Sequence, residues 1–196
     1  NPSVGYGWTT APAGAVDRGA PDSLRRDFVF SNSDSSFKVA MLPNGIYTVR
    51  VIIGDYSHLR DRIRVYANGL LKASILSIAA GKFVEFSFVV PVRGGELVLT
   101  FHDDGGSDPS WVVNAVYIME GAYFDFGASR AYKDFIRVVK NVYNPTTGYG
   151  WLSSGALGSE DRGVPDDLLR DFVSGQYART FVTDAPPGWY IVNSLH

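Results

Sequence analysis

Two segments of the sequence combine aromatic with short polar side chains in a way that suits a sugar ring. Tyr6 and Trp8 lie among glycines, where a backbone can come close to a ligand. Asp55, Tyr56 and His58 lie directly after an alternating, strand-like segment. Sugar recognition needs an aromatic face against the C–H side of the ring and nearby polar groups for its hydroxyls. Both segments are therefore candidate carbohydrate-binding loops.

Trp111 is a further candidate aromatic platform. A structural alternative stays open for both tryptophans: Trp8 would be a core side chain held by its flanking glycines, and Trp111 would begin a buried final strand. Four charged residues rank second as ligand contacts, because a structural salt-bridge cluster explains them at least as well. They are Asp17, Arg18, Arg26 and Asp27.

The segment 102–108 places Asp103, Asp104 and Asp108 around two glycines. Clustered carboxylates and carbonyls on a flexible loop are the ligands that calcium prefers, so calcium is the one cofactor that the sequence suggests. The segment lacks the ligand spacing of an EF-hand, and a plain polar loop is the alternative. A glycosidase pair is disfavoured here, since carboxylates in a glycine-rich segment are more often solvated turn residues.

Catalytic chemistry finds little support in the sequence. A serine hydrolase needs a nucleophile, a histidine and an orienting carboxylate, but only His58, His102 and His196 are available and there is no Gly-x-Ser-x-Gly motif. The absence of cysteine removes thiolate nucleophiles, thiolate metal sites and disulfides. The chain is therefore expected to be non-catalytic.

Charge and hydropathy exclude two classes of partner. The formal net charge is −2, from 18 Lys and Arg against 20 Asp and Glu, and neither sign forms a long run. No nucleic-acid or anionic-lipid partner is therefore expected. No apolar run approaches the roughly 20 residues of a membrane helix, and the N-terminus lacks the basic and then apolar pattern of an export signal. Membrane insertion is not expected.

The sequence contains an internal repeat whose copies are offset by 143 or 144 residues. A solenoid repeat spans roughly 20 to 50 residues, so this longer period indicates a tandem duplication of a domain. The expected organisation is a near-complete module in residues 1–143 and a truncated second copy in residues 144–196. The strongest matches are Gly5-Tyr6-Gly7-Trp8 with Gly148-Tyr149-Gly150-Trp151, Asp17-Arg18-Gly19 with Asp161-Arg162-Gly163, and Arg26-Asp27-Phe28-Val29 with Arg170-Asp171-Phe172-Val173.

The hydrophobic pattern predicts an all-β chain. Tyr47, Val49, Val51 and Ile53 alternate with the residues between them, which predicts a strand with one buried face. Short strands separated by turn signals favour an antiparallel sandwich, and no segment predicts a helix of more than a turn or two. Further strands are predicted at residues 62–67, 83–90, 96–101, 111–118 and 123–126.

Four segments together resemble the β-sandwich carbohydrate-binding module that accompanies rhamnogalacturonan lyases and acetylesterases, within the galactose-binding-domain-like and malectin-like group. The resemblance implies a jelly-roll fold, a polysaccharide or oligosaccharide ligand and an extracellular or cell-surface location. It also adds Asn114 to the candidate sugar contacts. The segments are Phe124-Asp125-Phe126-Gly127, Gly5-Tyr6-Gly7-Trp8 with Asp17-Arg18-Gly19, Leu42-Pro43-Asn44-Gly45-Ile46-Tyr47 leading to Gly54-Asp55, and Trp111-Val112-Val113-Asn114.

In that family the Phe-Asp-Phe-Gly strand comes first, and the Gly-Tyr-Gly-Trp segment follows it as it does between Phe124 and Gly148. The first copy is therefore expected to receive its first strand from residues 123–127, by return within the chain or by exchange with a neighbouring chain. Two alternatives to a free-standing binding module stay open. One is a structural subunit of a surface assembly or filament completed by strand exchange, and the other is an accessory domain of a larger polysaccharide lyase, esterase or glycoside hydrolase.

Overall fold

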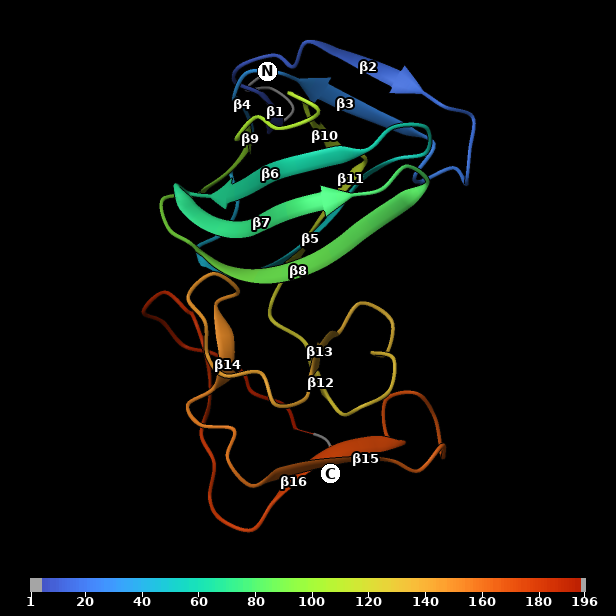
Figure 1. Ribbon diagram of the computed structural model, residues 1–196. Helices are drawn as coiled ribbons and strands as arrows, with labels where there is room; N and C mark the ends of the chain where they lie inside the picture. The colour runs from blue at the N-terminus through green and yellow to red at the C-terminus, as the bar shows by residue number, and fades with distance from the viewer. Residues whose placement is uncertain (1–4, 195–196) are drawn as a thin grey trace.

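The computed structural model describes residues 5–194, and that range consists of strands, turns and loops without a helix. Strands β1 to β11 form the N-terminal sandwich (residues 5–121), and β12 to β17 form a smaller C-terminal unit (residues 122–194) below it in Figure 1. The predicted all-β antiparallel sandwich is confirmed. Residues 1–4 and 195–196, His196 among them, lie outside the described range.

The N-terminal sandwich contains three sheets, and all neighbouring strands in them are antiparallel. The first sheet has the order β1 (Tyr6–Trp8), β4 (Ser35–Ala40), β9 (Glu96–Asp103), β6 (Arg60–Ala67) and β7 (Leu70–Ile78). The second has the order β11 (Ala115–Glu120), β5 (Gly45–Asp55) and β8 (Lys82–Val92). The third has the order β10 (Trp111–Val113), β3 (Asp27–Ser31) and β2 (Gly14–Asp17). In the described residues no helix is long and apolar enough to span a membrane.

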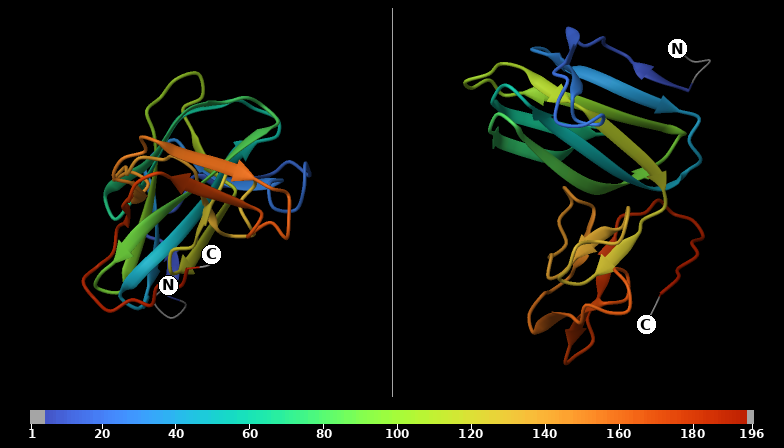
Figure 2. Two further views of the ribbon diagram at one scale, coloured as in Figure 1. Left: turned by 90° about the horizontal axis from the view of Figure 1, so that it is seen from below. Right: turned by 90° about the vertical axis from the view of Figure 1, so that its right-hand side faces the viewer.

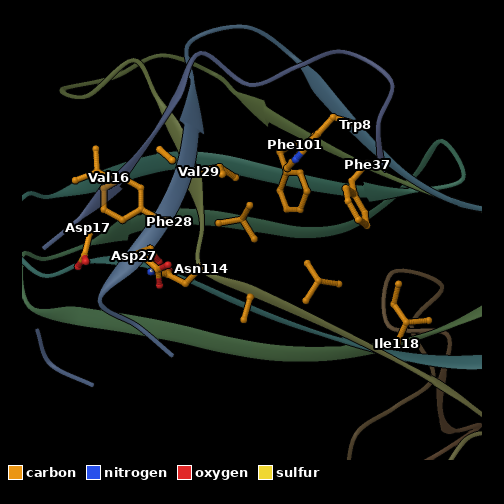
Figure 3. A pocket seen from close by; sticks show the side chains of 14 residues that line it. Trp8, Val16, Asp17, Asp27, Phe28, Val29, Phe37, Phe101, Asn114 and Ile118 are labelled. Carbon is orange, nitrogen blue, oxygen red and sulfur yellow. The ribbon is translucent and has the colours of Figure 1, made fainter. Parts of the chain in front are cut away.

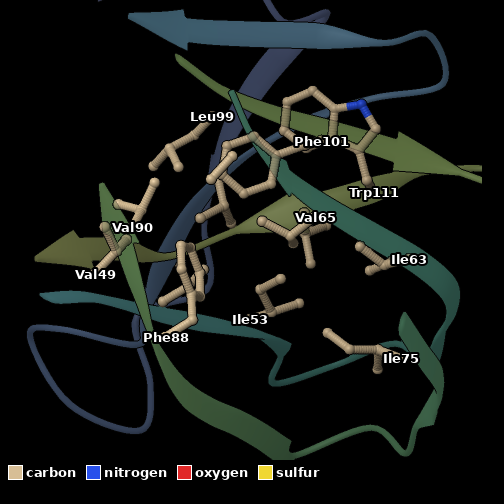
Figure 4. Packing of buried hydrophobic residues seen from close by; sticks show 14 of the residues in the cluster. Val49, Ile53, Ile63, Val65, Ile75, Phe88, Val90, Leu99, Phe101 and Trp111 are labelled. Atoms are coloured by element: carbon tan, nitrogen blue, oxygen red, sulfur yellow. The ribbon is translucent and has the colours of Figure 1, made fainter. Parts of the chain in front are cut away.

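Alternate apolar residues of the first two sheets fill the main core. Val49 and Ile53 of β5 are fully buried and face Val65 and Leu99 of the first sheet, as Figure 4 shows. Burying a side chain of this size stabilises the fold by about 1.5–3 kcal/mol. The core is therefore the main source of stability for the sandwich, and it lies away from the loops that join its strands.

Strand β5 is buried on both faces over most of its length, where the alternation predicts one buried face. Thr48 and Ile52, which point away from the main core, are also almost fully buried. The Thr48 hydroxyl donates to the carbonyl of Gly121 at 2.9 Å, so the chain leaving the sandwich covers this face. A second layer supplied by distant residues cannot be deduced from the local pattern of the strand.

The segment predicted as one strand over 111–118 is divided at Asn114 into β10 and β11. The amide group of Asn114 donates to the carbonyl oxygens of Arg25 and Asp27 at 3.1 and 3.0 Å. Its backbone N–H donates to the carbonyl of Ile52 at 3.0 Å. Asn114 therefore marks the point where the chain changes partner from β3 to β5, which is a structural role.

The C-terminal unit is built from three pairs of short strands around its own aromatic cluster. Phe124 lies 4.8 Å from Phe181, and Phe126 lies 5.6 Å from Trp151, measured between ring centroids. The parallel pair is β12 (Phe124–Phe126) with β13 (Ile136–Val138), and the antiparallel pairs are β14 (Tyr149–Trp151) with β17 (Phe181–Thr183) and β15 (Leu157–Asp161) with β16 (Asp171–Gly175).

Strand β8 joins the two parts of the chain. Val89 packs against Tyr149, and its backbone N–H donates to the carbonyl of Thr147 at 2.8 Å. The ammonium group of Lys72 donates to the carbonyls of Val89 and Pro145 at 3.2 and 3.3 Å. The C-terminal unit therefore packs on the N-terminal sandwich through β8, and the views in Figure 2 agree with this contact.

Residues 123–127 lie in the C-terminal unit. Their strand, β12, pairs with β13 and contacts rings of β14 and β17. Pairing of this strand with the N-terminal sandwich is not seen among the described residues, because its two phenylalanines cover aromatic residues of the C-terminal unit. Supply of such a strand to the first copy from another molecule stays a prediction.

Candidate functional site

Loops from different parts of the chain meet at one end of the N-terminal sandwich, called the loop end below. It comprises the β2–β3 connection (residues 18–26), the β5–β6 loop (56–59) and the β7–β8 turn (79–81), on the right of Figure 1, together with the β9–β10 loop (104–110). Asp55, the last residue of β5, connects three of these segments. Its side chain binds Arg18, and its carbonyl oxygen accepts from the N–H of Gly81 at 3.0 Å.

The carboxylate of Asp55 is fully buried and completely engaged. It accepts two hydrogen bonds from Arg18, both at 3.0 Å, one from Arg60 at 2.6 Å and one from the backbone N–H of Ser57 at 2.8 Å. Burial alone would raise the pKa of Asp55, but these hydrogen bonds outweigh it and hold the pKa well below its ordinary value. Asp55 is thus a permanently charged anchor that does not itself face solvent.

Arg18, which is held by Asp55, also contacts His58. One terminal nitrogen of Arg18 lies 3.0 Å from His58 Nδ1. A guanidinium group can only donate, so His58 Nδ1 accepts and the neutral ring carries its proton on Nε2. The His58 side chain is largely exposed. In this tautomer its Nε2–H is available as a hydrogen-bond donor at the surface.

Tyr56 supplies an aromatic surface in the same loop. It is 47% exposed and follows directly after the anchored Asp55. An exposed ring in the same loop as an imidazole that contacts a half-buried guanidinium supplies the two kinds of group that sugar binding needs, an apolar face and hydrogen-bond donors. Asp55, Tyr56 and His58 thus lie in or next to one loop, and Arg18 contacts Asp55 and His58. Arg60, the second partner of Asp55, was not singled out in the sequence.

The other predicted aromatic contacts lie elsewhere. Trp111 is fully buried, its indole N–H donates to the carbonyl of Ser33 at 2.7 Å, and its ring stacks on Phe101 at 5.3 Å. Trp8 is half-buried and stacks on Trp111 at 5.8 Å. The structure therefore agrees with the core alternative for Trp111, whose ring no solvent-borne ligand can reach. Tyr6 is exposed on β1, away from the loop end.

Trp8 and Asn114 line an apolar pocket between the sheets, shown in Figure 3. The pocket has a volume of about 550 Å³, and most of its wall is apolar. Phe37 and Phe101 lie next to Trp8, and Asp27 lies near Asn114 at the other end. The predicted site residues are thus dispersed: Asp55, Tyr56 and His58 lie at the loop end, Trp8 and Asn114 line this pocket, and Tyr6 and Trp111 belong to neither place.

The acidic loop does not form a metal-binding group within residues 5–194. Asp108 pairs with Arg60 at 2.7 Å, and Asp104 pairs with Arg64 at 2.6 Å. Asp103 accepts from the backbone N–H of Gly105 at 2.7 Å, and burial raises its pKa. Because each carboxylate points to a different partner, the geometry gives no support to the predicted calcium site.

His102 is held between two carboxylates. Its Nδ1 lies 2.6 Å from Asp34, and its Nε2 lies 3.0 Å from Asp104, which also pairs with Arg64. The hydrogen bond to Asp34, together with the one to Asp104, raises the pKa of His102 above its ordinary value despite partial burial. The protonated ring therefore links β9 to the turn before β4 and to the acidic loop.

We expect the contribution of His102 to stability to decrease with rising pH. A raised folded-state pKa stabilises the fold fully below the unfolded pKa of about 6.5, and the effect disappears as the pH rises through the folded pKa. Because the pair is partly exposed, the effect should be at most about 1 kcal/mol. Urea unfolding of the wild type and His102→Gln at a series of pH values measures it. A stability difference that stays constant or grows with pH would contradict this assignment.

No protein-family model matches the chain. A segment of 117 residues is 35% identical to β-agarase A of Zobellia galactanivorans, covering 58% of this chain and 21% of that enzyme. The chain thus spans about a fifth of the length of this relative. Among solved structures, the chain is similar to the plant receptor-like kinase ANX2, with 11% identity, a TM-score of 0.47 and coverage of 60% of this chain and 40% of that one. It is also similar to CBM35 of Paenibacillus barcinonensis, with 17% identity, a TM-score of 0.38 and coverage of 60% and 94%.

Proposed function

We propose that this chain is a non-catalytic carbohydrate-binding module of a longer extracellular protein. Its sugar-contacting surface is formed by Arg18, Tyr56 and His58 at the loop end. The observation that carries the proposal is the exposed Tyr56 in the same loop as His58, whose ring contacts the Arg18 guanidinium that the buried Asp55 holds. The 35% identity with part of a β-agarase supports a polysaccharide as the ligand.

In this proposal each residue has a distinct task. The Tyr56 ring contacts the C–H face of a sugar, where an apolar surface is favourable. Arg18 and the Nε2–H of His58 donate to sugar hydroxyls at the edge of the ring. Asp55 is a positioning residue, because its hydrogen bonds to Arg18 and Ser57 fix the guanidinium and the loop before a ligand arrives.

The polysaccharides to test follow from two independent indications. The relative is named as an agarase, which makes agar-type galactans the first class. The resemblance to modules attached to rhamnogalacturonan lyases and acetylesterases makes pectic polysaccharides the second. Affinity electrophoresis in gels that contain each soluble polysaccharide is expected to retard the chain with at least one of these classes. Unchanged mobility with both classes would contradict the proposal.

We expect Tyr56→Ala to weaken this binding at least about tenfold, equivalent to about 1.4 kcal/mol. The free energy of unfolding should change by less than about 0.5 kcal/mol, because the ring is a surface side chain on a loop. Isothermal titration with the retarding polysaccharide and urea unfolding measure the two effects. Tyr177→Ala, an exposed tyrosine of the C-terminal unit, is the matched control and should bind normally. Equal binding by wild type and Tyr56→Ala would remove Tyr56 from the site.

A further inference from the structure

A groove lies where the C-terminal unit meets the outer face of the β11-β5-β8 sheet, and it is called the junction groove below. Its volume is about 350 Å³, which is within the range of pockets for small ligands, roughly 300–1,000 Å³. Arg50 of β5 and Ser87 of β8, which are paired across the two strands, line one wall. Phe135, just before β13, and Arg137 of β13 line the other. The two walls belong to different parts of the chain, since β13 lies below β8 in Figure 1.

Positively charged side chains predominate around the junction groove. Four of its lining residues are cationic, and Glu85 is the one carboxylate among the described residues that line it. The whole chain, by contrast, has a formal net charge of −2. The cations are thus concentrated at this place and do not follow from the composition. They are Arg50, Arg130, Lys133 and Arg137.

Arg50 is already paired with two carboxylates. Its guanidinium group lies 3.4 Å from Glu85 on the same sheet and 2.9 Å from Asp134, which belongs to the C-terminal unit. Its side chain is only 19% exposed. The pair of Arg50 with Asp134 therefore links the two walls and orders them before a ligand arrives, which lowers the cost of binding.

The other three cations lack such compensation. Within residues 5–194 the guanidinium group of Arg130 has no hydrogen-bond or ion-pair partner. One terminal nitrogen of Arg137 donates to the carbonyls of Ala128 and Ser129 at 3.2 and 3.3 Å, and Lys133 forms no salt bridge with a described residue. A guanidinium group has five N–H donors, so most donors of the two arginines remain available to a ligand.

Part of the groove wall is aromatic. Phe135 is half-buried, and its ring lies 5.6 Å from the ring of Tyr123 and 5.8 Å from that of Tyr132. These contacts hold the Phe135 ring in place. An apolar face suits the C–H side of a sugar ring, and guanidinium groups bind oxyanions through paired hydrogen bonds. The junction groove therefore combines the two features needed to bind a sugar that carries negative charge.

We infer that the junction groove is a second saccharide site, which binds a sugar residue bearing an anionic group, either a sulfate ester or a carboxylate. Arg130, Lys133 and Arg137 contact the anionic group, and Phe135 contacts the sugar ring. The negative charge of the ligand follows from the groove itself, whereas its saccharide nature rests on the proposed function. The groove contains none of the residues of the loop end, so the two sites are separable by mutation.

The test uses the full chain and two pairs of oligosaccharides whose members differ in charge. One pair is a sulfated galactan oligosaccharide and its desulfated form, and the other is an oligogalacturonide and its methyl ester. Isothermal titration is expected to show saturable binding of at least one charged member. In the Tyr56→Ala variant, where the loop end no longer contributes, its neutral counterpart should bind at least about tenfold more weakly. The pair that shows this difference identifies the anionic group as sulfate or carboxylate.

Ionic strength provides a second readout. The affinity for the charged oligosaccharide should fall as the salt concentration rises from about 0.01 M to about 0.15 M, because the Debye length decreases from about 30 Å to about 8 Å. The affinity for a neutral oligosaccharide should not change in this way. An affinity for the charged oligosaccharide that is independent of salt would contradict the role of the cations.

Arg130→Gln combined with Lys133→Gln removes two of the uncompensated charges and should weaken binding of the charged oligosaccharide at least about tenfold. Arg93→Gln combined with Lys140→Gln is the matched control, because it removes the same two residue types at exposed positions outside the groove. It should change the affinity less than about twofold. All four side chains are exposed, so both double variants should keep the wild-type melting temperature.

Three results would overturn the inference. One is the absence of saturable binding of either charged oligosaccharide at low ionic strength, and another is equal binding of it by the two double variants. The third is equal affinity for a single-stranded oligonucleotide of the same net charge, because that result would assign the groove to polyanions in general.

Tyr56→Ala distinguishes this inference from the proposed function. If this variant binds the charged oligosaccharide normally while the wild type binds no neutral one, the junction groove is supported and the loop end is contradicted. If Tyr56→Ala abolishes binding of the charged oligosaccharide, that ligand belongs to the loop end and the inference is wrong. If only neutral oligosaccharides bind, and Tyr56→Ala abolishes their binding, the proposed function stands and the inference is overturned.

Discussion

Replacement of Asp55 by asparagine is expected to lower the free energy of unfolding by about 3–5 kcal/mol, the cost of removing one partner of a buried ion pair. The change keeps the size of the side chain but leaves Arg60, which is itself buried, without this counter-charge. It also weakens the interaction of residue 55 with Arg18. Urea unfolding at neutral pH measures the effect directly.

Asp17→Asn is the matched control for this prediction. Asp17 also binds an arginine, Arg26, but both side chains are about half exposed, so the loss should be at most about 1 kcal/mol. Equal losses for the two variants would show that Asp55 is not a buried anchor. The wild type should also lose its advantage over Asp55→Asn in acid. A depressed carboxyl pKa stabilises the fold above the unfolded pKa, and this contribution is lost as the pH falls toward the folded pKa.

Trp111→Ala is expected to destabilise the chain by about 3–5 kcal/mol, as is usual for a core aromatic side chain. The ring is fully buried, and its loss opens a cavity next to Trp8 and Phe101. It also leaves the carbonyl of Ser33 without its indole donor. Trp189, which is fully exposed, provides the control, since Trp189→Ala should change stability by less than about 0.5 kcal/mol. A Trp111→Ala variant as stable as the wild type would contradict the assignment of Trp111 to the core.

The strands could be predicted from the sequence because alternation is a local property. Residues 83–90 and 96–101 are predicted as strands and lie within β8 (Lys82–Val92) and β9 (Glu96–Asp103). The division of the predicted strand 111–118 at Asn114 could not be predicted. It depends on hydrogen bonds to Arg25 and Asp27, whose proximity is a property of the assembled sheets.

The candidate site was predictable only in part, because some of its contacts join residues that are distant in the sequence. Asp55, Tyr56 and His58 are neighbours in sequence, so their common loop follows from the end of the preceding strand. Arg18 joins them from 37 residues away, and no local signal indicates that contact. Trp111 follows a segment rich in turn residues and Tyr56 follows a long strand, and neither local pattern indicates that the first side chain is buried and the second exposed.

The acidic loop shows how a composition signal can be explained by charge pairing. Asp104 and Asp108 suggested calcium because they are close in sequence. In the structure each has an arginine partner from β6, Arg64 and Arg60 respectively. Arg64 lies 40 residues before Asp104 and Arg60 lies 48 residues before Asp108, so neither pairing can be seen in the local sequence.

The central claim, that the loop end of this chain binds carbohydrate, is tested most directly by mapping backbone amide chemical shifts during a titration. The labelled wild-type chain is titrated with oligosaccharides from agar and from pectic polysaccharide. We predict saturable shifts at residues 18–19 and 55–59 with at least one of them, and little change at the pocket residues 115–118. No saturable shift with either ligand, or shifts confined to residues 115–118, would contradict the account.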